Sequence, residues 1–455
     1  MPIATVNPTT GALVRSFDEH DDAHVDRALS RARDAAATWR RATIAERTAL
    51  LHGVADALER DRERLAALAT LEMGKTVQAA RDEVAKCAFA CRYYAAHAEP
   101  LLAPEPLHID GADAVLHFQP LGVLLAVMPW NFPFWQVVRA AAPAILAGNV
   151  VVLKHASNVP QCALALEALV AGAGAPPGVF QTLLVSAART GAIVEDARVA
   201  AVTLTGSEAA GRDVAAHAGR AIKKTVLELG GSDPFVVLAD ADLALAASNA
   251  VKGRMINNGQ SCIAAKRFIV VEAVADEFES RFIEFVRALR VGDPMDPATD
   301  VGPLATRQIR DELASQVERS VRAGARLAVG GGPVAGPGFF YAPTVLTGVP
   351  LDAPALTEEL FGPVAPVVRV RDTDEAIARA NATAFGLGAS VWTRSGALAD
   401  RATDEIDAGM VFVNTIVASD PRFPFGGVKA SGYGREVGLQ GLREFVNVKT
   451  VRGSA

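Results

Sequence analysis

A single cysteine, Cys262, lies where a thiol could do chemistry. It follows the polar, glycine-containing stretch 256–261 and precedes an apolar run rich in β-branched residues, whereas a structural cysteine would more naturally lie inside such a run. No histidine lies within 40 residues of it. Because a free thiol titrates at about pH 8.5, a reactive Cys262 would need an activating group other than a neighbouring imidazole.

Two further polar residues follow apolar strand patterns, and each allows two interpretations. Glu228 precedes the pair Gly230-Gly231, which would let the backbone turn or approach another segment closely. Taken alone, Glu228 is more simply a solvated carboxylate at a strand end. Asn131 could cap a helix whose first turn contains Pro133, or its amide could donate a hydrogen bond to a developing oxyanion. Neither position decides the question by itself.

Gly206 and Ser207 lie where a strand pattern gives way to a helical one. A helix N-terminus with free backbone N–H groups and a hydroxyl can hold a phosphate. No strict G-x-G-x-x-G follows any strand, and the stretch 206–211 is spaced like a P-loop but continues with Arg212 where lysine is required. The sequence therefore argues against an ordinary NTPase.

The elements that must position these residues alternate between strand and helix patterns. Three helical stretches are predicted over 25–39, 44–61 and 62–98, followed by an alternating strand pattern over 107–120. A strand-then-helix rhythm follows, and a second α/β series begins after Glu228. This pattern predicts a parallel, doubly wound sheet that binds ligands at its strand ends.

The composition excludes several classes of protein. A chain of 455 residues has room for about three domains, and a net charge of -6 gives no reason to expect a nucleic acid partner. Four scattered cysteines indicate a reducing, cytoplasmic setting, and none has the companions of a metal site. The N-terminus has no signal-peptide pattern, and the most apolar run, 140–153, is too short to span a membrane. We therefore expect a soluble protein with no membrane partner.

Six motifs together resemble the aldehyde dehydrogenase superfamily from end to end. They are PWNFP at Pro129, LTGS at Leu204, LELGG at Leu227, GQSC at Gly259, EELFGPV at Glu358 and PFGGVKASGYGRE at Pro424. Their order and separations are those of the family, including the 34 positions from Glu228 to Cys262. The short N-terminus and the stretch KHASNVPQ are similar to the short bacterial succinate-semialdehyde dehydrogenases.

The resemblance implies the fold and the domain organisation. It implies a doubly wound dinucleotide-binding domain (1–100 and 120–229), an α/β catalytic domain (230–428) and a small β oligomerisation element (101–119 and 429–455). A terminal strand over 445–451 would otherwise leave an exposed sheet edge, which proteins usually cover. We therefore expect a homo-oligomer, either a dimer or a tetramer.

The resemblance also implies the chemistry, which needs no histidine. Cys262 matches the nucleophile that forms a thiohemiacetal and then a thioester. Glu228 matches the general base that activates the hydrolytic water, a task that favours a carboxylate with a raised pKa. Asn131 matches the oxyanion donor, together with the backbone N–H of Cys262.

The cofactor implied by the resemblance is NADP, with NAD also possible. Glu359 matches the group that holds the nicotinamide ribose, Ser207 a pyrophosphate contact and Lys154 the group that reaches the adenosine ribose. The full set of expected cofactor-binding residues is Trp130, Lys154, Ser157, Gly206, Ser207, Leu229, Glu359 and Phe361. NAD-preferring relatives commonly have glutamate at the position of Ser157, and a serine removes the repulsion that a carboxylate would exert on a 2′-phosphate. Alternatively, Ser157 merely caps the helix predicted near Pro160.

The implied substrate is an aldehyde with a distal carboxylate, most simply succinic semialdehyde. Arg139 matches the arginine that holds this carboxylate in succinate-semialdehyde dehydrogenases, and it would share a helix face with Trp135. The expected substrate-binding residues are Phe132, Trp135, Arg139, Ser261 and Ser419, with no metal. One departure stands out: some relatives carry a second arginine six residues before the nucleophile, where this chain has Ile256.

Other functions stay open at this stage. The substrate could be another semialdehyde or an aliphatic aldehyde. A cysteine-dependent thioester hydrolase or acyltransferase would use half of the chemistry but would need no dinucleotide site, so Lys154, Ser207 and Glu359 argue against it. A non-catalytic relative would not need Cys262, Glu228 and Asn131 together.

Overall fold

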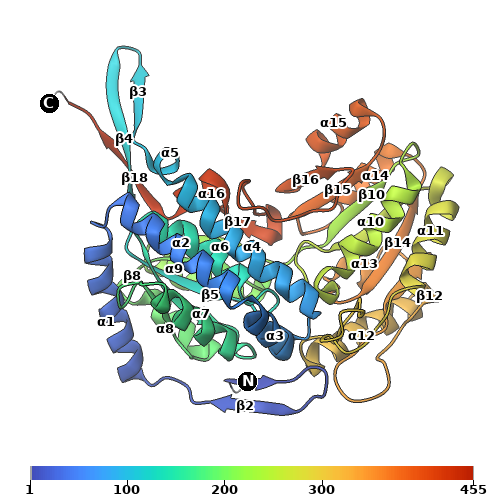
Figure 1. The fold of residues 1–455 in the computed structure, drawn as a ribbon. Helices are drawn as coiled ribbons and strands as arrows, with labels where there is room; N and C mark the ends of the chain where they lie inside the picture. Colours follow the sequence, from blue (N-terminus) through green and yellow to red (C-terminus); the bar gives the residue numbers. More distant parts are fainter. Residues whose placement is uncertain (1–2, 454–455) are drawn as a thin grey trace.

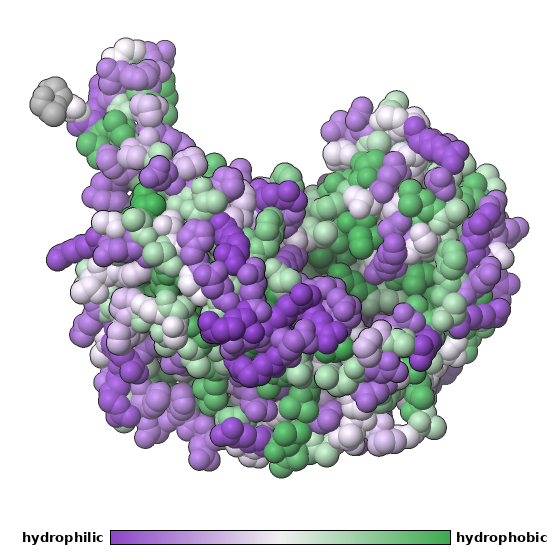
Figure 2. Space-filling view, viewed as in Figure 1, coloured by the Kyte–Doolittle hydropathy of each residue, from purple (hydrophilic) through white to green (hydrophobic). Residues whose placement is uncertain are grey.

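Two sheets, each covered by helices, organise the chain. The computed structural model describes residues 3–453, and Figure 1 shows two lobes with a three-stranded arm projecting from the first. Each lobe contains one mainly parallel sheet, so the predicted α/β class is confirmed. Figure 2 shows a hollow between the two lobes, with apolar side chains on its wall.

The first lobe is built on a six-stranded sheet in the order β17-β9-β8-β5-β6-β7. Its strands are β5 (Val123–Met128), β6 (Val150–His155), β7 (Phe180–Thr182), β8 (Val199–Thr205), β9 (Lys224–Glu228) and β17 (Gly432–Tyr433). Only β17 runs antiparallel to its neighbour. The connecting helices are α6 (Trp135–Leu146), α7 (Pro160–Gly172), α8 (Thr190–Glu195) and α9 (Glu208–Arg220). The parallel strands therefore end at one edge of the sheet, where Asn131, Gly206 and Glu228 follow or finish β5, β8 and β9.

The N-terminal part differs from the sequence expectation in two ways. It begins with a hairpin of β1 (Ile3–Val6) and β2 (Leu13–Phe17), whereas only helices were predicted. The helices are α1 (Asp22–Trp39), α2 (Ile44–Arg60), α3 (Arg62–Met73), α4 (Val77–Ala96) and α5 (Ala98–Leu102), so the single helix predicted over 62–98 is wrong. The break lies at Gly74, whose φ of 80° ends α3, and Thr76 caps α4. A Cβ at Gly74 would lie 2.8 Å from the carbonyl oxygen of Pro303, so packing requires the glycine.

Helix α4 fixes the start of α6, the helix that carries Trp135 and Arg139. The carboxylate of Glu83 accepts hydrogen bonds from the backbone N–H groups of Phe134 and Trp135, both at 2.8 Å. Glu83 also forms an ion pair with Lys75, and both side chains are buried. The carboxylate thus replaces a local cap and sets the direction in which α6 enters the site.

The second lobe is built on a seven-stranded sheet in the order β12-β13-β14-β11-β10-β15-β16. Its strands are β10 (Asp233–Val237), β11 (Ala265–Val271), β12 (Arg326–Val329), β13 (Thr344–Thr347), β14 (Val364–Val370), β15 (Gly388–Trp392) and β16 (Met410–Val413), with only β12 antiparallel to its neighbour. Its helices are α10 (Leu243–Met255), α11 (Glu272–Arg287), α12 (Arg307–Arg322), α13 (Pro354–Thr357), α14 (Thr373–Asn381) and α15 (Gly396–Glu405). Stacked aromatic rings, among them Phe235 and Trp392 at 5.0 Å, fill the layer between sheet and helices.

The arm is a three-stranded antiparallel sheet made from both expected segments. A hairpin of β3 (Glu105–Ile109) and β4 (Ala112–Pro120) turns at Asp110 and Gly111, which both have positive φ. The terminal strand β18 (Val446–Val451) pairs with β4. Residues before β18 do not belong to the arm: β17 joins the first sheet, and α16 (Gly438–Glu444) follows it.

No helix within residues 3–453 is long and apolar enough to cross a membrane.

Candidate active site

Cys262 is held by a left-handed turn that follows α10. Asn257, Asn258 and Gly259 all have positive φ, at 56°, 59° and 76°. Asparagine tolerates this conformation better than most residues. A Cβ at Gly259 would lie 2.4 Å from the backbone of Gly362, so this position requires glycine. The polar stretch before Cys262 is thus needed to bend the chain sharply back toward β11.

The side chains of this turn join the two lobes. The amide of Asn257 donates to the carbonyl oxygens of Asn131 and Gln260, at 2.7 and 3.0 Å. The amide of Asn258 donates to the carbonyls of Gly74 and Pro303, at 2.9 and 3.0 Å. Segments from α3, β5 and the second lobe therefore meet at the cysteine turn.

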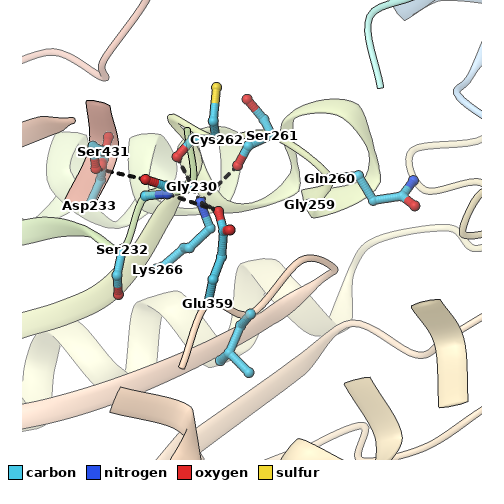
Figure 3. Close-up of polar contacts among 12 residues, drawn as sticks. Gly230, Ser232, Asp233, Gly259, Gln260, Ser261, Cys262, Lys266, Glu359 and Ser431 are labelled. Atoms are coloured by element: carbon cyan, nitrogen blue, oxygen red, sulfur yellow. Dashed lines mark hydrogen bonds and ion pairs between the residues drawn. The ribbon is translucent and has the colours of Figure 1, made fainter. Parts of the chain in front are cut away.

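Two buried cations brace the backbone around the cysteine. Lys266 donates to the carbonyls of Ser261 and Cys262, at 2.8 and 2.7 Å, and forms an ion pair with Glu359 at 3.2 Å (Figure 3). Arg254 donates to four backbone carbonyls, including that of Gly259 at 2.6 Å. Arg254 therefore points into the backbone and cannot replace the arginine that is absent at Ile256. Figure 3 shows the sulfur of Cys262 pointing away from Lys266 and Glu359.

Cys262 lies where two cavities meet. One is lined by Trp130, Asn131, Gly206, Ser207, Glu228, Leu229, Glu359 and Phe361, among others. The other is lined by Lys86, Phe132, Trp135, Arg139, Ile256, Ser261, Ser419 and Phe425, among others. Cys262 lines both. All expected substrate residues and most expected cofactor residues are thus brought together, on opposite sides of the thiol.

Glu228 is buried at the end of β9, not solvated as its position alone suggested. One carboxylate oxygen lies 3.4 Å from the guanidinium of Arg139, and the other has no hydrogen-bond partner within residues 3–453. Burial raises the pKa of Glu228 to about 7, against the opposing field of Arg139. The carboxylate can therefore both accept and release a proton near neutral pH.

The two glycines after Glu228 allow two close approaches. A Cβ at Gly230 would lie 2.6 Å from a carboxylate oxygen of Glu359, and a Cβ at Gly231 would lie 2.6 Å from the carbonyl oxygen of Cys262. The N–H of Gly231 also donates to Glu359 at 3.0 Å. The pair therefore lets β9, the cysteine turn and the Glu359 loop converge.

The thiol of Cys262 is not activated by its surroundings as they stand. Burial and the nearby Glu228 carboxylate raise its pKa well above the usual value, while Arg139 and Lys266 oppose this. Because Glu228 titrates near neutrality, it is the available acceptor for the thiol proton.

Asn131 is not a helix cap. Helix α6 begins at Trp135, and its N-cap residue is Phe134. The buried amide of Asn131 donates one hydrogen bond, of 3.1 Å, to the carbonyl of Gln260. The second N–H of the amide is left to serve another acceptor near Cys262.

The first cavity combines aromatic walls with the N-terminus of a helix. Trp130 and Phe361 form its aromatic walls, with ring centroids 5.6 Å apart in an edge-on arrangement. Gly206 and Ser207 bring the N-terminus of α9 to it, and Ser207 caps that helix by accepting from the N–H of Ala210. The cavity leaves no room for a side chain at Gly230, because a Cβ there would collide with Glu359.

Lys154 and Ser157 lie at and after the end of β6, and neither lines the cavity beside Cys262. Burial lowers the pKa of Lys154, and its ammonium forms no ion pair within residues 3–453. Ser157 does not cap α7, whose N-cap residue is Val159. The alternative role of Ser157 as a cap is therefore wrong, and its hydroxyl is free for other contacts.

Arg139 lines the second cavity, but carboxylates already surround it. Its guanidinium forms an ion pair with Glu436 at 2.5 Å, and it donates to the hydroxyl of Thr205 at 3.2 Å. It also lies over the ring of Phe425. Arg139 is 1% exposed, so its charge is not on a solvated helix face.

Comparison with known proteins agrees with this geometry. The sequence matches the aldehyde dehydrogenase family over residues 1–451.

The chain belongs to the aldehyde dehydrogenase family.

Its relatives in this family include close ones. It is 56% identical to succinate-semialdehyde dehydrogenase (NADP+) 1 of Mycobacterium tuberculosis over 454 residues, which cover 99% of both chains. It is 55% identical to the succinate-semialdehyde dehydrogenase (NADP+) of Mycobacterium avium, with 99% of this chain and 96% of that protein covered. The succinic semialdehyde dehydrogenase of Streptococcus pyogenes, solved in complex with NADP+, superposes with a TM-score of 0.97, at 38% identity and full coverage of both chains.

Sequence reasoning gave no role to four charged residues of this aldehyde dehydrogenase site: Lys86, Arg254, Lys266 and Glu436. Glu436 ends the motif PFGGVKASGYGRE, and Lys266 lies four residues after Cys262, so both had a local signal. Lys86 lies in a helix far from every motif, and only the packing of α4 against α6 reveals it.

We predict that Glu228→Gln changes the pH dependence of stability. A carboxyl whose pKa rises from 4.5 to about 7 on folding favours the protonated form, so the wild type loses stability as pH rises through this range. The variant has no ionisable group at this position, so its free energy of unfolding should rise relative to that of the wild type by about 1–3 kcal/mol between pH 5 and pH 8. Thermal unfolding at both pH values checks this, and a constant difference between the two proteins would contradict it.

Proposed function

We propose that this chain oxidises succinic semialdehyde to succinate with NADP+, through a thioester on Cys262. The observation that carries the proposal is the position of Cys262 between a cavity lined by aromatic rings, Glu359 and the N-terminus of α9 and an aromatic cavity that contains cations. The identity of 56% to a named NADP+-dependent succinate-semialdehyde dehydrogenase over nearly the whole chain supports the same substrate and cofactor.

The first half of the proposed reaction forms the covalent adduct. Glu228 accepts the thiol proton, and the sulfur of Cys262 adds to the aldehyde carbon. The carbonyl oxygen becomes an oxyanion, toward which Asn131 can turn its second N–H. Hydride acceptance is the chemistry that a bound nicotinamide supplies, with Glu359, Trp130 and Phe361 as the residues that would hold it.

The second half releases the acid. Glu228 first passes the thiol proton to solvent. Once the acyl group is a thioester on Cys262, the Glu228 carboxylate accepts a proton from the water that attacks the thioester carbon. The carbon–sulfur bond then breaks, and the thiolate of Cys262 takes this proton from Glu228. A carboxylate with a pKa of about 7 suits both proton transfers.

The substrate assignment is tested with a panel of aldehydes with and without a terminal carboxylate, with both cofactors, by absorbance at 340 nm. We expect kcat/KM for succinic semialdehyde with NADP+ to exceed that for butanal. Equal values for the two aldehydes would refute the proposed substrate, and no reduction of either cofactor would refute the proposed activity.

We predict that substitutions of Cys262 and of Glu228 affect different steps of the reaction. Cys262→Ala should abolish oxidation, since no other thiol lines either cavity. Glu228→Gln should slow release of the acyl group at least a hundredfold, in the usual range for general-base removal of about 10²–10⁴. Rapid mixing of this variant at high pH, where the thiol ionises without its base, should show a burst of NADPH before slow turnover. A fully active Cys262 variant would remove the nucleophile from the proposal.

We predict that Ser157→Glu shifts the cofactor preference from NADP+ toward NAD+. A glutamate would repel the 2′-phosphate, while Lys154 supplies the attracting charge. We expect the ratio of kcat/KM for the two cofactors to change by roughly tenfold or more, which corresponds to about 1.4 kcal/mol. Ser157→Ala is the matched control, because it removes the hydroxyl without adding charge. An unmoved ratio in Ser157→Glu would place the discrimination elsewhere.

We also propose that the chain assembles as a homo-oligomer through the arm, in a reducing compartment such as the cytoplasm. The four cysteines are buried and free, which suits such a setting. Strand β18 pairs on one side only, and Ile109, Val448 and Val451 on the arm are about half exposed.

We predict a dimer or tetramer by light scattering at micromolar concentration. Val448→Glu should lower the mass, because it places a charge on the arm. Leu245→Glu is the control, since Leu245 is similarly exposed on α10, away from the arm. A monomeric wild type would contradict the proposal.

A further inference from the structure

Lys86 is a cation in the second cavity to which no role has been given. It lies on α4 and lines the cavity together with Cys262, Arg139 and Ser419. Its ammonium lies 4.3 Å from the centroid of the Trp135 ring, so the aromatic face holds it over the cavity. Ile256, which occupies the place of a second arginine in some relatives, lines the same cavity.

The other buried or half-buried charges near this cavity have partners. Arg139 pairs with Glu436, and Glu83 pairs with Lys75. Asp420 pairs with Arg422 at 2.6 Å. Asp82, at the exposed rim, accepts a hydrogen bond from Gln78.

Lys86 differs from these groups because it forms no ion pair and no hydrogen bond within residues 3–453. Burial, together with the positive charge of Arg139, lowers its pKa to about 8, only partly opposed by Cys87, Asp420 and Glu83. A half-buried ammonium without a counterion would gain from an anion in the cavity. Arg139 alone would attract an anion only weakly, because the carboxylate of Glu436 already neutralises its charge.

We propose that Lys86 is the residue that selects the distal carboxylate of the substrate, with the aldehyde end at Cys262. The proposal rests on the function proposed above. Two polar groups complete the site: the hydroxyl of Ser419 and the indole N–H of Trp135 line the same cavity, and both are buried without a hydrogen-bond partner among residues 3–453. Ile256 in the cysteine turn carries no charge, so the positive charge for the carboxylate comes from Lys86 on α4.

The test compares succinic semialdehyde with butanal, which has the same number of carbons but no carboxylate. For Lys86→Met, loss of one charge-assisted contact should lower kcat/KM for succinic semialdehyde by roughly 10- to 100-fold, mainly through KM. The loss for butanal should be far smaller. Lys86→Arg, which keeps the charge, should retain most of the preference. Lys252→Met is the matched control, since Lys252 is exposed on α10, and it should behave as the wild type.

The ratio of kcat/KM for the two aldehydes is measured on one preparation, so a partly unfolded variant does not disturb it. If Lys86→Met does not fold, Lys86→Gln takes its place. A wild type without preference for succinic semialdehyde would refute the proposed substrate. A wild type with the preference, together with an unchanged ratio in the Lys86 variants, would refute the role of Lys86 and leave the proposed function intact.

Discussion

The site depends on one constraint: the cysteine turn must be fixed to both lobes at once. Three consecutive residues with positive φ, Asn257 to Gly259, bend the chain so sharply that its carbonyls and amides face both lobes. Arg254 then donates to the carbonyl of Gly259, and Lys266 donates to the carbonyls of Ser261 and Cys262. A turn of this kind is costly in isolation, on the order of 1–3 kcal/mol for each strained residue, so it persists only because the surrounding contacts determine it. The position of the thiol between two cavities follows from this turn.

Much of the fold followed from hydrophobic periodicity and from motif order. The strands β5, β6, β8, β10 and β11 and the helices after them agree with the predicted pattern, because each buried parallel strand is an uninterrupted apolar run. The hairpin β1–β2 escaped prediction because β2 is exposed over nearly its whole length and lacks such a run. The break at Gly74 escaped because it is enforced by Pro303, which is far away in the sequence.

The site shows the same division between local and long-range information. Cys262, Glu228 and Asn131 each lie in a motif, and the residues that line the cavities are mostly their neighbours in sequence. The charged groups that lie beside these residues are far from them in the sequence. Glu436 pairs with Arg139 from the far end of the chain, and the charge of Arg139 lowers the pKa of Lys86 on α4. Sequence reasoning could name Arg139 but could not show that a carboxylate already neutralises it.

The charges around Cys262 also explain why a buried thiol can be kept unreactive until it is needed. Glu228 and Glu436 share Arg139, so two carboxylates lie beside one guanidinium near the thiol. Burial raises the pKa of both carboxyls and of the thiol, the Glu228 carboxylate adds to the effect on the thiol, and Arg139 opposes the rise in all three groups. A cationic group that enters the first cavity moves this balance toward the thiolate, because a nearby opposite charge favours the ionised form.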